Sequence, residues 1–152
     1  MSNEALFQVS VKGLIKNNKG DILLLHSTPD EVKQVSGTQG GCWDLPGGRA
    51  HVGETIKETL LREVAEETQI SNLENLSFFM STPTNVSVIL DHSKSVDIIL
   101  FAYTCTIPVN TEVQLGLEHD SYKWCSIAEA RTLLAPNFPE RFLNKVAELA
   151  MD

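Results

Sequence analysis

Residues 48–70 read GRAHVGETIKETLLREVAEETQI, and this stretch predicts a short loop followed by a helix. Thr55 is followed three residues later by Glu58, which is the pattern of a capping box, so a helix should begin after this threonine. Apolar residues recur at helical spacing at Ile56, Leu60, Leu61 and Val64. They predict one buried face on a helix that runs to about Thr68.

Three glutamates crowd the C-terminal half of this predicted helix. At about 100° per residue, Glu63, Glu66 and Glu67 fall within roughly a third of the helix circumference. Like charges at these spacings destabilise a helix, and acidic groups near its C-terminus also oppose the helix dipole. A solvated helix face, supported by an ion pair between Glu58 and Arg62, is one interpretation. The other is a site for Mg²⁺ or Mn²⁺, which bind converging oxygen ligands.

The spacing of residues before and within the helix favours the metal site. The residues that stand at fixed intervals are Gly48, Glu54, Arg62, Glu63, Glu66 and Glu67. This spacing resembles the box of the Nudix hydrolase family, in which a Gly, five residues, a Glu and seven residues precede Arg-Glu-aliphatic-any-Glu-Glu-any-Gly-aliphatic. With each residue type at about one in fifteen, six matches arise by chance on the order of once in 10⁷ starting positions. The flanking segments 43–48 and 118–124 also resemble the family.

One position departs from the family pattern. The second Gly of the box is Gln69 here, at the point where the helix should end. A left-handed backbone is usual after a helix, and a residue other than Gly costs roughly 1–2 kcal/mol in that conformation. We therefore expect an adjusted helix end, with the chemistry intact because every carboxylate of the box is present.

The resemblance implies that water attacks phosphorus while divalent metal, Mg²⁺ or alternatively Mn²⁺, bridges the protein and a pyrophosphate group. Glu66 and Glu67 match the principal metal ligands of the family, and Glu63 matches a third ligand or the base that activates water. Glu54 is implied to lie near the metal. Arg62 is expected to pair with a box glutamate and orient it, rather than to contact phosphate directly.

Residues outside the helix are further candidates for the site. Gly47 and Gly48 form a tight turn whose backbone can approach a metal closely, and the resemblance implies that a carbonyl of this loop is a ligand. Arg49 is a candidate for contact with a substrate phosphate, although an exposed Arg beside a glycine turn is as often only solvated. Glu118 is implied to complete the metal site or to act as the base. Phe7 is a candidate for the wall of a base pocket.

Strand-like segments lie on both sides of this helix. The predicted strands are 9–15, 22–25, 42–45, 76–80, 85–90, 96–107 and 122–125, and further helices are predicted at 126–134 and 140–151. Turn-forming residues at 17–21 and 91–95 predict two hairpins. This order predicts an α+β fold, an α/β/α sandwich with a Nudix-like mixed β-sheet flanked by helices, as a single domain over 1–152.

Composition and charge limit the partners of the chain. The formal net charge is −8, so the chain should repel nucleic acid, and a polyphosphate substrate requires divalent metal between it and the protein. No apolar run approaches the roughly 20 residues of a membrane helix. Three cysteines without a Cys-x-x-Cys pair favour reduced thiols. We expect a cytoplasmic protein with no membrane partner, and a homodimer as one oligomeric state because many Nudix proteins dimerise.

The predicted activity is hydrolysis of a phosphoanhydride bond in a nucleoside diphosphate linked to another group. Motifs typical of the coenzyme A, NADH, ADP-ribose and diadenosine polyphosphate types are not found, which favours the small MutT-like type acting on nucleoside triphosphates or nucleotide sugars. Two alternatives stay open: a nucleotide-binding regulator with a relict site, and a diphosphate isomerase of the same fold. The polar stretch 27–41 is predicted as a long loop, whether lid or plain connection. His51 and His119 are expected to be surface or helix-capping residues.

Overall fold

Eight strands and three helices are formed by the residues that the computed structural model describes, which are 3–28, 35–36, 42–90 and 94–151. In chain order they are β1 (Phe7–Lys16), β2 (Ile22–Ser27), β3 (Val35–Ser36), β4 (Cys42–Asp44), β5 (Gly47–Arg49), α1 (Ile56–Thr68), β6 (Glu74–Leu90), β7 (Lys94–Thr106), β8 (His119–Cys125), α2 (Ile127–Leu134) and α3 (Glu140–Glu148). A 3₁₀ turn at Leu149–Met151 follows α3. Among these helices, none is long and apolar enough to cross a membrane.

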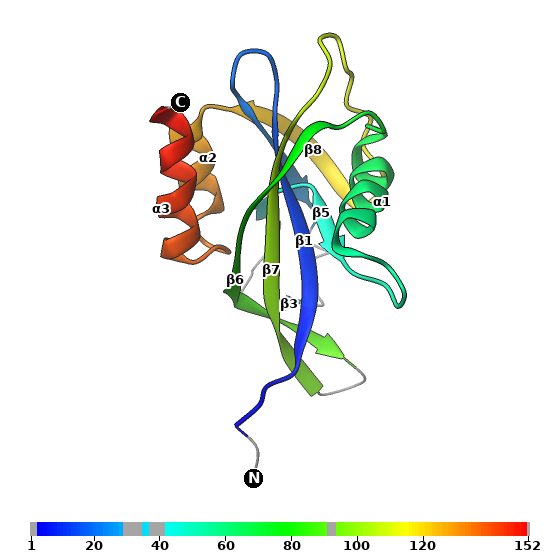
Figure 1. Cartoon of the computed structure of the whole chain (residues 1–152), viewed down its shortest axis with the longest axis vertical. Helices are drawn as coiled ribbons and strands as arrows, with labels where there is room; N and C mark the ends of the chain where they lie inside the picture. Colours follow the sequence, from blue (N-terminus) through cyan, green and yellow to red (C-terminus); the bar gives the residue numbers. More distant parts are fainter. Residues whose placement is uncertain (1–2, 29–34, 37–41, 91–93, 152) are drawn as a thin grey trace.

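The strands form one mixed sheet (Figure 1). Over the described part of the chain its order is β3-β6-β7-β1-β2-β4, while β5 pairs with β1 and β8 pairs with β2. β1 runs parallel to β7 along its whole length, and the other strand pairs are antiparallel. The predicted hairpin at 17–21 is confirmed by the pairing of Lys16 with Ile22, and the second hairpin by the pairing of Leu90 with Lys94.

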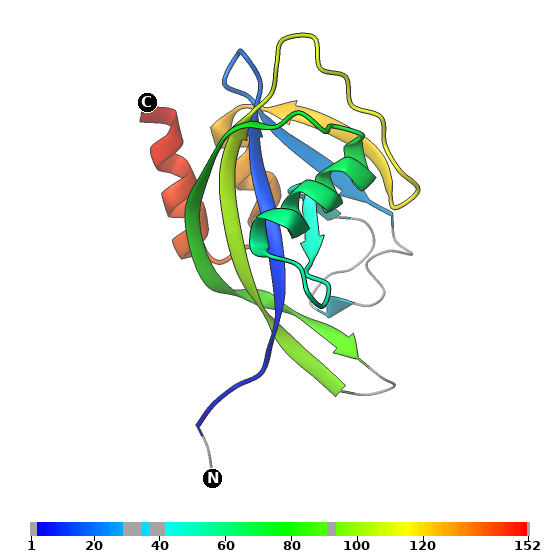
Figure 2. The ribbon, with the colours of Figure 1, turned by 45° about the vertical axis from the view of Figure 1, so that its right-hand side comes forward.

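Helices cover both faces of this sheet (Figures 1 and 2). On one face α1 buries Leu60 against a cluster that includes Val11 of β1. On the other face α2 and α3 bury a second cluster, in which Phe142 of α3 and Leu14 of β1 are fully buried. Because successive strand residues point to opposite faces, β1 supplies both cores. The α+β fold with a flanked mixed sheet, expected from the sequence, is confirmed.

β6 is one continuous strand where the sequence predicted two. It spans Glu74–Leu90, and its pairing with β7 shifts register in three places, one of them directly after Pro83. Proline has no N–H to donate to a strand ladder, so it is tolerated where pairing is irregular. Pro83, which lies between the two predicted strands, therefore coincides with a shift in pairing and does not end the strand.

Two short strands form where the sequence indicated no strand. Gly47–Arg49 pairs antiparallel with β1 as β5, where only a tight turn was expected. In the predicted loop 27–41, Val35–Ser36 pairs with β6 as β3, so the segment is not a plain loop throughout. The rest of the predicted lid, at 29–34 and 37–41, lies outside the described residues, and its role stays a prediction.

The predicted capping box of α1 is present. The Thr55 hydroxyl accepts a hydrogen bond from the Glu58 N–H at 3.2 Å, and the Glu58 carboxylate accepts one from the Thr55 N–H at 3.0 Å. After Thr68 the backbone of Gln69 is left-handed, with a φ of 59°. The helix thus ends with the backbone conformation that favours Gly, although Gln stands there. α1 therefore holds its acidic face in the predicted register.

Candidate active site

One cavity of about 590 Å³ gathers most of the predicted site residues. It lies where α1, β1, β5 and the turn before β8 meet. The predicted residues that line it are Gly47, Gly48, Arg49, Arg62, Glu63, Glu66, Glu67 and Glu118. A volume of this size falls within the range of about 300–1,000 Å³ that small-molecule sites occupy. The glutamate spacing read from the sequence thus places its carboxylates in a single concave site.

Phe7 and Glu54 do not line this cavity. The Phe7 side chain is 40% exposed, and strand alternation instead turns Gln8, Ser10 and Lys12 of β1 toward the cavity. Phe7 therefore lies on the other face of β1, and the expectation that it forms a pocket wall is wrong. Glu54 instead forms an ion pair with Arg62.

Arg62 is the centre of an ion-pair network on the acidic face of α1. Its Nε donates to Glu54 at 2.6 Å, and its Nη1 donates to Glu63 at 2.9 Å and to Glu66 at 3.3 Å. Its Nη2 also donates to the Arg49 carbonyl at 3.1 Å. These contacts match the pairing expected of Arg62, and the mutual repulsion of the glutamates is offset by one shared guanidinium.

The contacts of Glu54 fix its ionisation state. Its hydrogen bonds from Arg62 and from the His51 N–H lower the pKa of the carboxyl to about 2. The same network raises the pKa of Arg62 above its usual range. Glu54 is thus a charged partner of Arg62 across the physiological pH range.

The two glycines of β5 lie in close contact with their neighbours. A Cβ on Gly48 would lie 2.5 Å from the carboxyl carbon of Glu63, and one on Gly47 would lie 2.0 Å from the Val11 carbonyl oxygen. Gly47 also has a φ of +140°, a backbone conformation that residues other than glycine rarely adopt. Glycine is therefore required at position 47, where β5 lies against the backbone of β1, whereas a side chain at position 48 would displace the Glu63 carboxylate.

Glu67 is the buried carboxylate of the site. Its Oε1 accepts the Gly47 N–H at 2.7 Å, and its Oε2 lies 3.5 Å from Nε2 of His119. Burial, with further contributions from the charges of Glu63 and Asp44, outweighs the attraction of nearby donors and raises the Glu67 pKa to about 8. A carboxyl with such a pKa is mostly protonated at neutral pH, and a cation bound beside it would favour its ionised form.

Lys12 forms a buried cationic contact that the sequence analysis missed. Its Nζ donates to Asp44 at 3.0 Å and to the carbonyls of Leu45 and Gly47 at 3.3 and 3.4 Å. Burial lowers its pKa, but attraction to Asp44, Glu67 and neighbouring charges outweighs this and the net pKa is raised. A lone Lys within an apolar strand segment was the signal available in the sequence.

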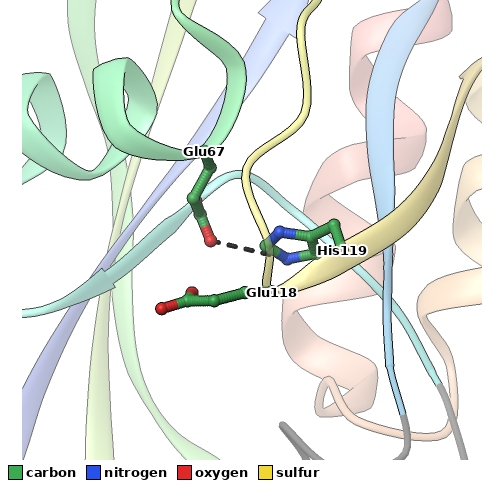
Figure 3. Close-up of side chains that lie close together, drawn as sticks. All are labelled: Glu67, Glu118 and His119. Atoms are coloured by element: carbon green, nitrogen blue, oxygen red, sulfur yellow. Dashed lines mark ion pairs between the residues drawn. The ribbon is translucent and has the colours of Figure 1, made fainter.

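Glu118 and His119 reach the cavity from the turn before β8 and the first residue of β8 (Figure 3). One ligand atom from each of Glu67, Glu118 and His119 lies within 4.8 Å of the others. Burial lowers the His119 pKa to about 4, so its ring is neutral at pH 7. The expectation that His119 is a surface residue is wrong, since its side chain is only 6% exposed.

The donors of this cavity fit a hard divalent cation. Glu63, Glu66, Glu67 and Glu118 bring carboxylate oxygens to one cavity, and these are the ligands that Mg²⁺ and Mn²⁺ take. The pKa of Glu67 is raised chiefly by burial, with smaller contributions from Glu63 and Asp44, so a bound cation would favour its ionised form. The residues present therefore fit the metal that the family implies.

Comparison with known proteins identifies the family. A model of the NUDIX domain matches residues 6–146, and the chain therefore belongs to the NUDIX domain family. Over 77 residues, or 49% of the chain, it is 39% identical to the ADP-ribose pyrophosphatase of Methanocaldococcus jannaschii. That match covers 40% of the length of the curated relative. The Nudix family expected from the sequence is therefore confirmed.

Solved structures share the fold over nearly the whole chain. The MutT protein from Methanosarcina mazei Go1 is 28% identical, with a TM-score of 0.71 over 99% of this chain and 97% of that chain. An Ap4A hydrolase from C. elegans is 19% identical, with a TM-score of 0.64 over 95% of this chain and 96% of that chain. The second likeness concerns the fold alone, whereas the first agrees with the small MutT-like type.

Proposed function

We propose that this protein hydrolyses a phosphoanhydride bond in a nucleoside diphosphate linked to another group. The observation that carries the proposal is the convergence of Glu63, Glu66, Glu67 and Glu118 on one cavity, where Arg62 holds Glu63 and Glu66. A binding protein with a relict site is the alternative, but such a site would not need four carboxylates at one cavity with two of them held by Arg62. Retention of the whole network supports catalysis.

Mg²⁺, with Mn²⁺ as an alternative, is the proposed cofactor, and Glu63, Glu66, Glu67 and Glu118 are the residues that would hold it. When bound, such an ion neutralises the pyrophosphate and polarises its phosphorus toward attack by water. A bound divalent ion would also reduce the electrostatic repulsion between the substrate and the protein, because a net charge of −8 otherwise repels a polyphosphate.

The residues of the chain position the reacting groups. Arg62 holds Glu63 and Glu66 in place through Nη1, and the Gly47 N–H holds Glu67. The attacking water must lose a proton as it adds to phosphorus, and Glu63 and Glu118 are the two carboxylates proposed to take it. Arg49 is exposed at the cavity and is proposed to contact the far phosphate of the substrate.

The substrate class is proposed from the cavity and the relatives together. The acidic end of the cavity suits a metal-bound pyrophosphate, while Val86, Ile98 and Leu100 add apolar lining that suits a base or sugar. The curated relative is named an ADP-ribose pyrophosphatase and the solved neighbour a MutT protein. Nucleoside triphosphates, nucleotide sugars and ADP-ribose are therefore the substrates to test first.

The test is phosphate or pyrophosphate release from these compounds with Mg²⁺, with Mn²⁺ and with EDTA. Glu66→Gln should lower turnover by at least 100-fold, since it removes a charged oxygen ligand but keeps the side-chain shape. The exposed Glu112→Gln is the matched control and should keep wild-type turnover. Turnover that survives both EDTA and Glu66→Gln would refute the metal-dependent hydrolase. Nucleotide binding without turnover would favour the regulator.

We also propose a single domain that acts in the cytoplasm. Cys42, Cys105 and Cys125 are free thiols, which suits a reducing compartment. Light scattering of the purified chain would test whether it forms the homodimer expected from the family.

A further inference from the structure

His119 is a buried histidine whose ring is poorly satisfied by the protein. Its side chain is only 6% exposed, yet Nδ1 is buried without a hydrogen-bond partner. Among the described residues the polar contact of the ring is Glu67, whose Oε2 lies 3.5 Å from Nε2, longer than a good hydrogen bond. Buried polar groups are normally paired, so an imidazole kept here without a strong partner needs an explanation.

The ring points at the ligand cluster. Nε2 faces Glu67, and Figure 3 shows the imidazole lying beside the carboxylates of Glu67 and Glu118. The three donor atoms lie within 4.8 Å of one another. Ligands of a small divalent ion lie about 3 Å apart when adjacent and about 4.2 Å apart when opposite. The 3.5 Å between Oε2 of Glu67 and Nε2 of His119 falls in this range, and rotation of the exposed Glu118 side chain would bring in the third donor.

We propose that Nε2 of His119 is a direct ligand of a divalent metal ion, together with the carboxylates of Glu67 and Glu118. This assignment rests on the proposed function, in which the glutamates bind the metal ion, and it adds a nitrogen ligand to their carboxylate oxygens. Imidazole suits later transition metals better than Mg²⁺, which prefers oxygen. The site should therefore favour Co²⁺ or Ni²⁺ over Mg²⁺ more strongly than carboxylates alone would. Because Nδ1 has no outer partner, binding should be weaker than at a fully supported histidine ligand.

Mn²⁺ is the probe that reports the bond directly. Pulsed EPR of the full chain, loaded with less than one equivalent of Mn²⁺, should show electron spin-echo modulation from a coordinated ¹⁴N nucleus. In protein made with ¹⁵N-labelled histidine this modulation should change to the ¹⁵N pattern. Labelling leaves the fold untouched, so this arm holds even where a variant fails to fold.

His119→Gln should abolish the nitrogen modulation. It should also weaken Co²⁺ binding by about 10- to 100-fold, the range seen when even an outer partner of a metal site is lost, and weaken Mg²⁺ binding less. His51→Gln is the matched control, because His51 also lines the cavity and could supply a nitrogen. His26→Gln is the second control, because the His26 ring pairs with Asp120 and does not line the cavity. Both controls should retain the modulation.

The outcomes separate this inference from the proposed function. Mn²⁺ bound with dependence on Glu66 and Glu67 but without nitrogen modulation would overturn the histidine ligand and leave the hydrolase intact. His119 would then serve only as a neighbour of Glu67. Modulation lost in His51→Gln instead of His119→Gln would likewise overturn it. Failure of Mn²⁺ to bind the wild-type chain at all would overturn both proposals.

Discussion

Replacing Lys12 by Met should destabilise the protein by about 3 kcal/mol. The change removes a charged hydrogen bond to Asp44 at 3.0 Å and two weaker contacts to the carbonyls of Leu45 and Gly47. The Lys12 and Asp44 side chains are 14% and 27% exposed, so Asp44 is left as a largely buried charge. Breaking a buried pair costs about 3–5 kcal/mol, and the partial exposure of Asp44 places this case at the lower end. Met retains the packing of the aliphatic part of the Lys side chain, so the loss of stability measures the removal of the charged group.

Urea denaturation in EDTA measures this effect. The midpoint should fall without a change in the slope of unfolding free energy against urea. Lys19→Met, in the exposed turn between β1 and β2, should stay within about 0.5 kcal/mol of the wild type. Combining Lys12→Met with Asp44→Asn should cost about 2 kcal/mol less than the sum of the single changes, because the two side chains share one interaction. Additive effects, or a Lys12→Met variant as stable as the Lys19 control, would refute the reasoning.

Three further predictions test the helix end, the site and a core thiol. Gln69→Gly should raise the free energy of unfolding by about 0.5–1 kcal/mol, because Gly relieves the left-handed strain; a lower melting temperature would contradict this. Glu118→Gln should cut turnover at least tenfold, and unchanged turnover would remove Glu118 from the mechanism. Burial raises the Cys105 pKa to about 12 from an ordinary value of 9.0, so above pH 9 only the unfolded thiol ionises. Above pH 9 the unfolding free energy of the wild type should therefore fall by about 1.4 kcal/mol per pH unit relative to that of Cys105→Val. A difference between the two proteins that does not change with pH would contradict the raised pKa.

The sequence could predict α1 and its acidic face because both depend on neighbours within a few residues. The capping box joins Thr55 to Glu58, and the three carboxylates share a face by helical spacing alone. Fold class followed because the order of strands and helices admits few arrangements. The C-terminal end of α1 was predicted for the same local reason, even though Gln69 departs from the family pattern.

The rest of the site depends on contacts between distant segments. Lys12 meets Asp44 across 32 residues, and β5 exists only because β1 lies beside it. Phe7 was assigned to the cavity because apolar strand residues suggest a pocket wall, but the pattern does not say which strand face meets which helix. His119 was missed because its burial results from the contact between β8 and α1, which the local sequence around a single histidine does not predict.

The division of charge in the cavity explains why the metal should bind beside Glu67. Arg62 bonds to Glu54, Glu63 and Glu66, and Lys12 bonds to Asp44, while neither cation donates a hydrogen bond to Glu67 in the part of the chain that the structure describes. What Glu67 receives is a neutral N–H from Gly47. Arg62 and Lys12 thus pair with the less buried carboxylates of the cluster. Glu67, the most buried carboxylate, remains available to bind a metal ion. A site built only for stability would have paired Glu67 first, because an unpaired buried carboxylate costs the most.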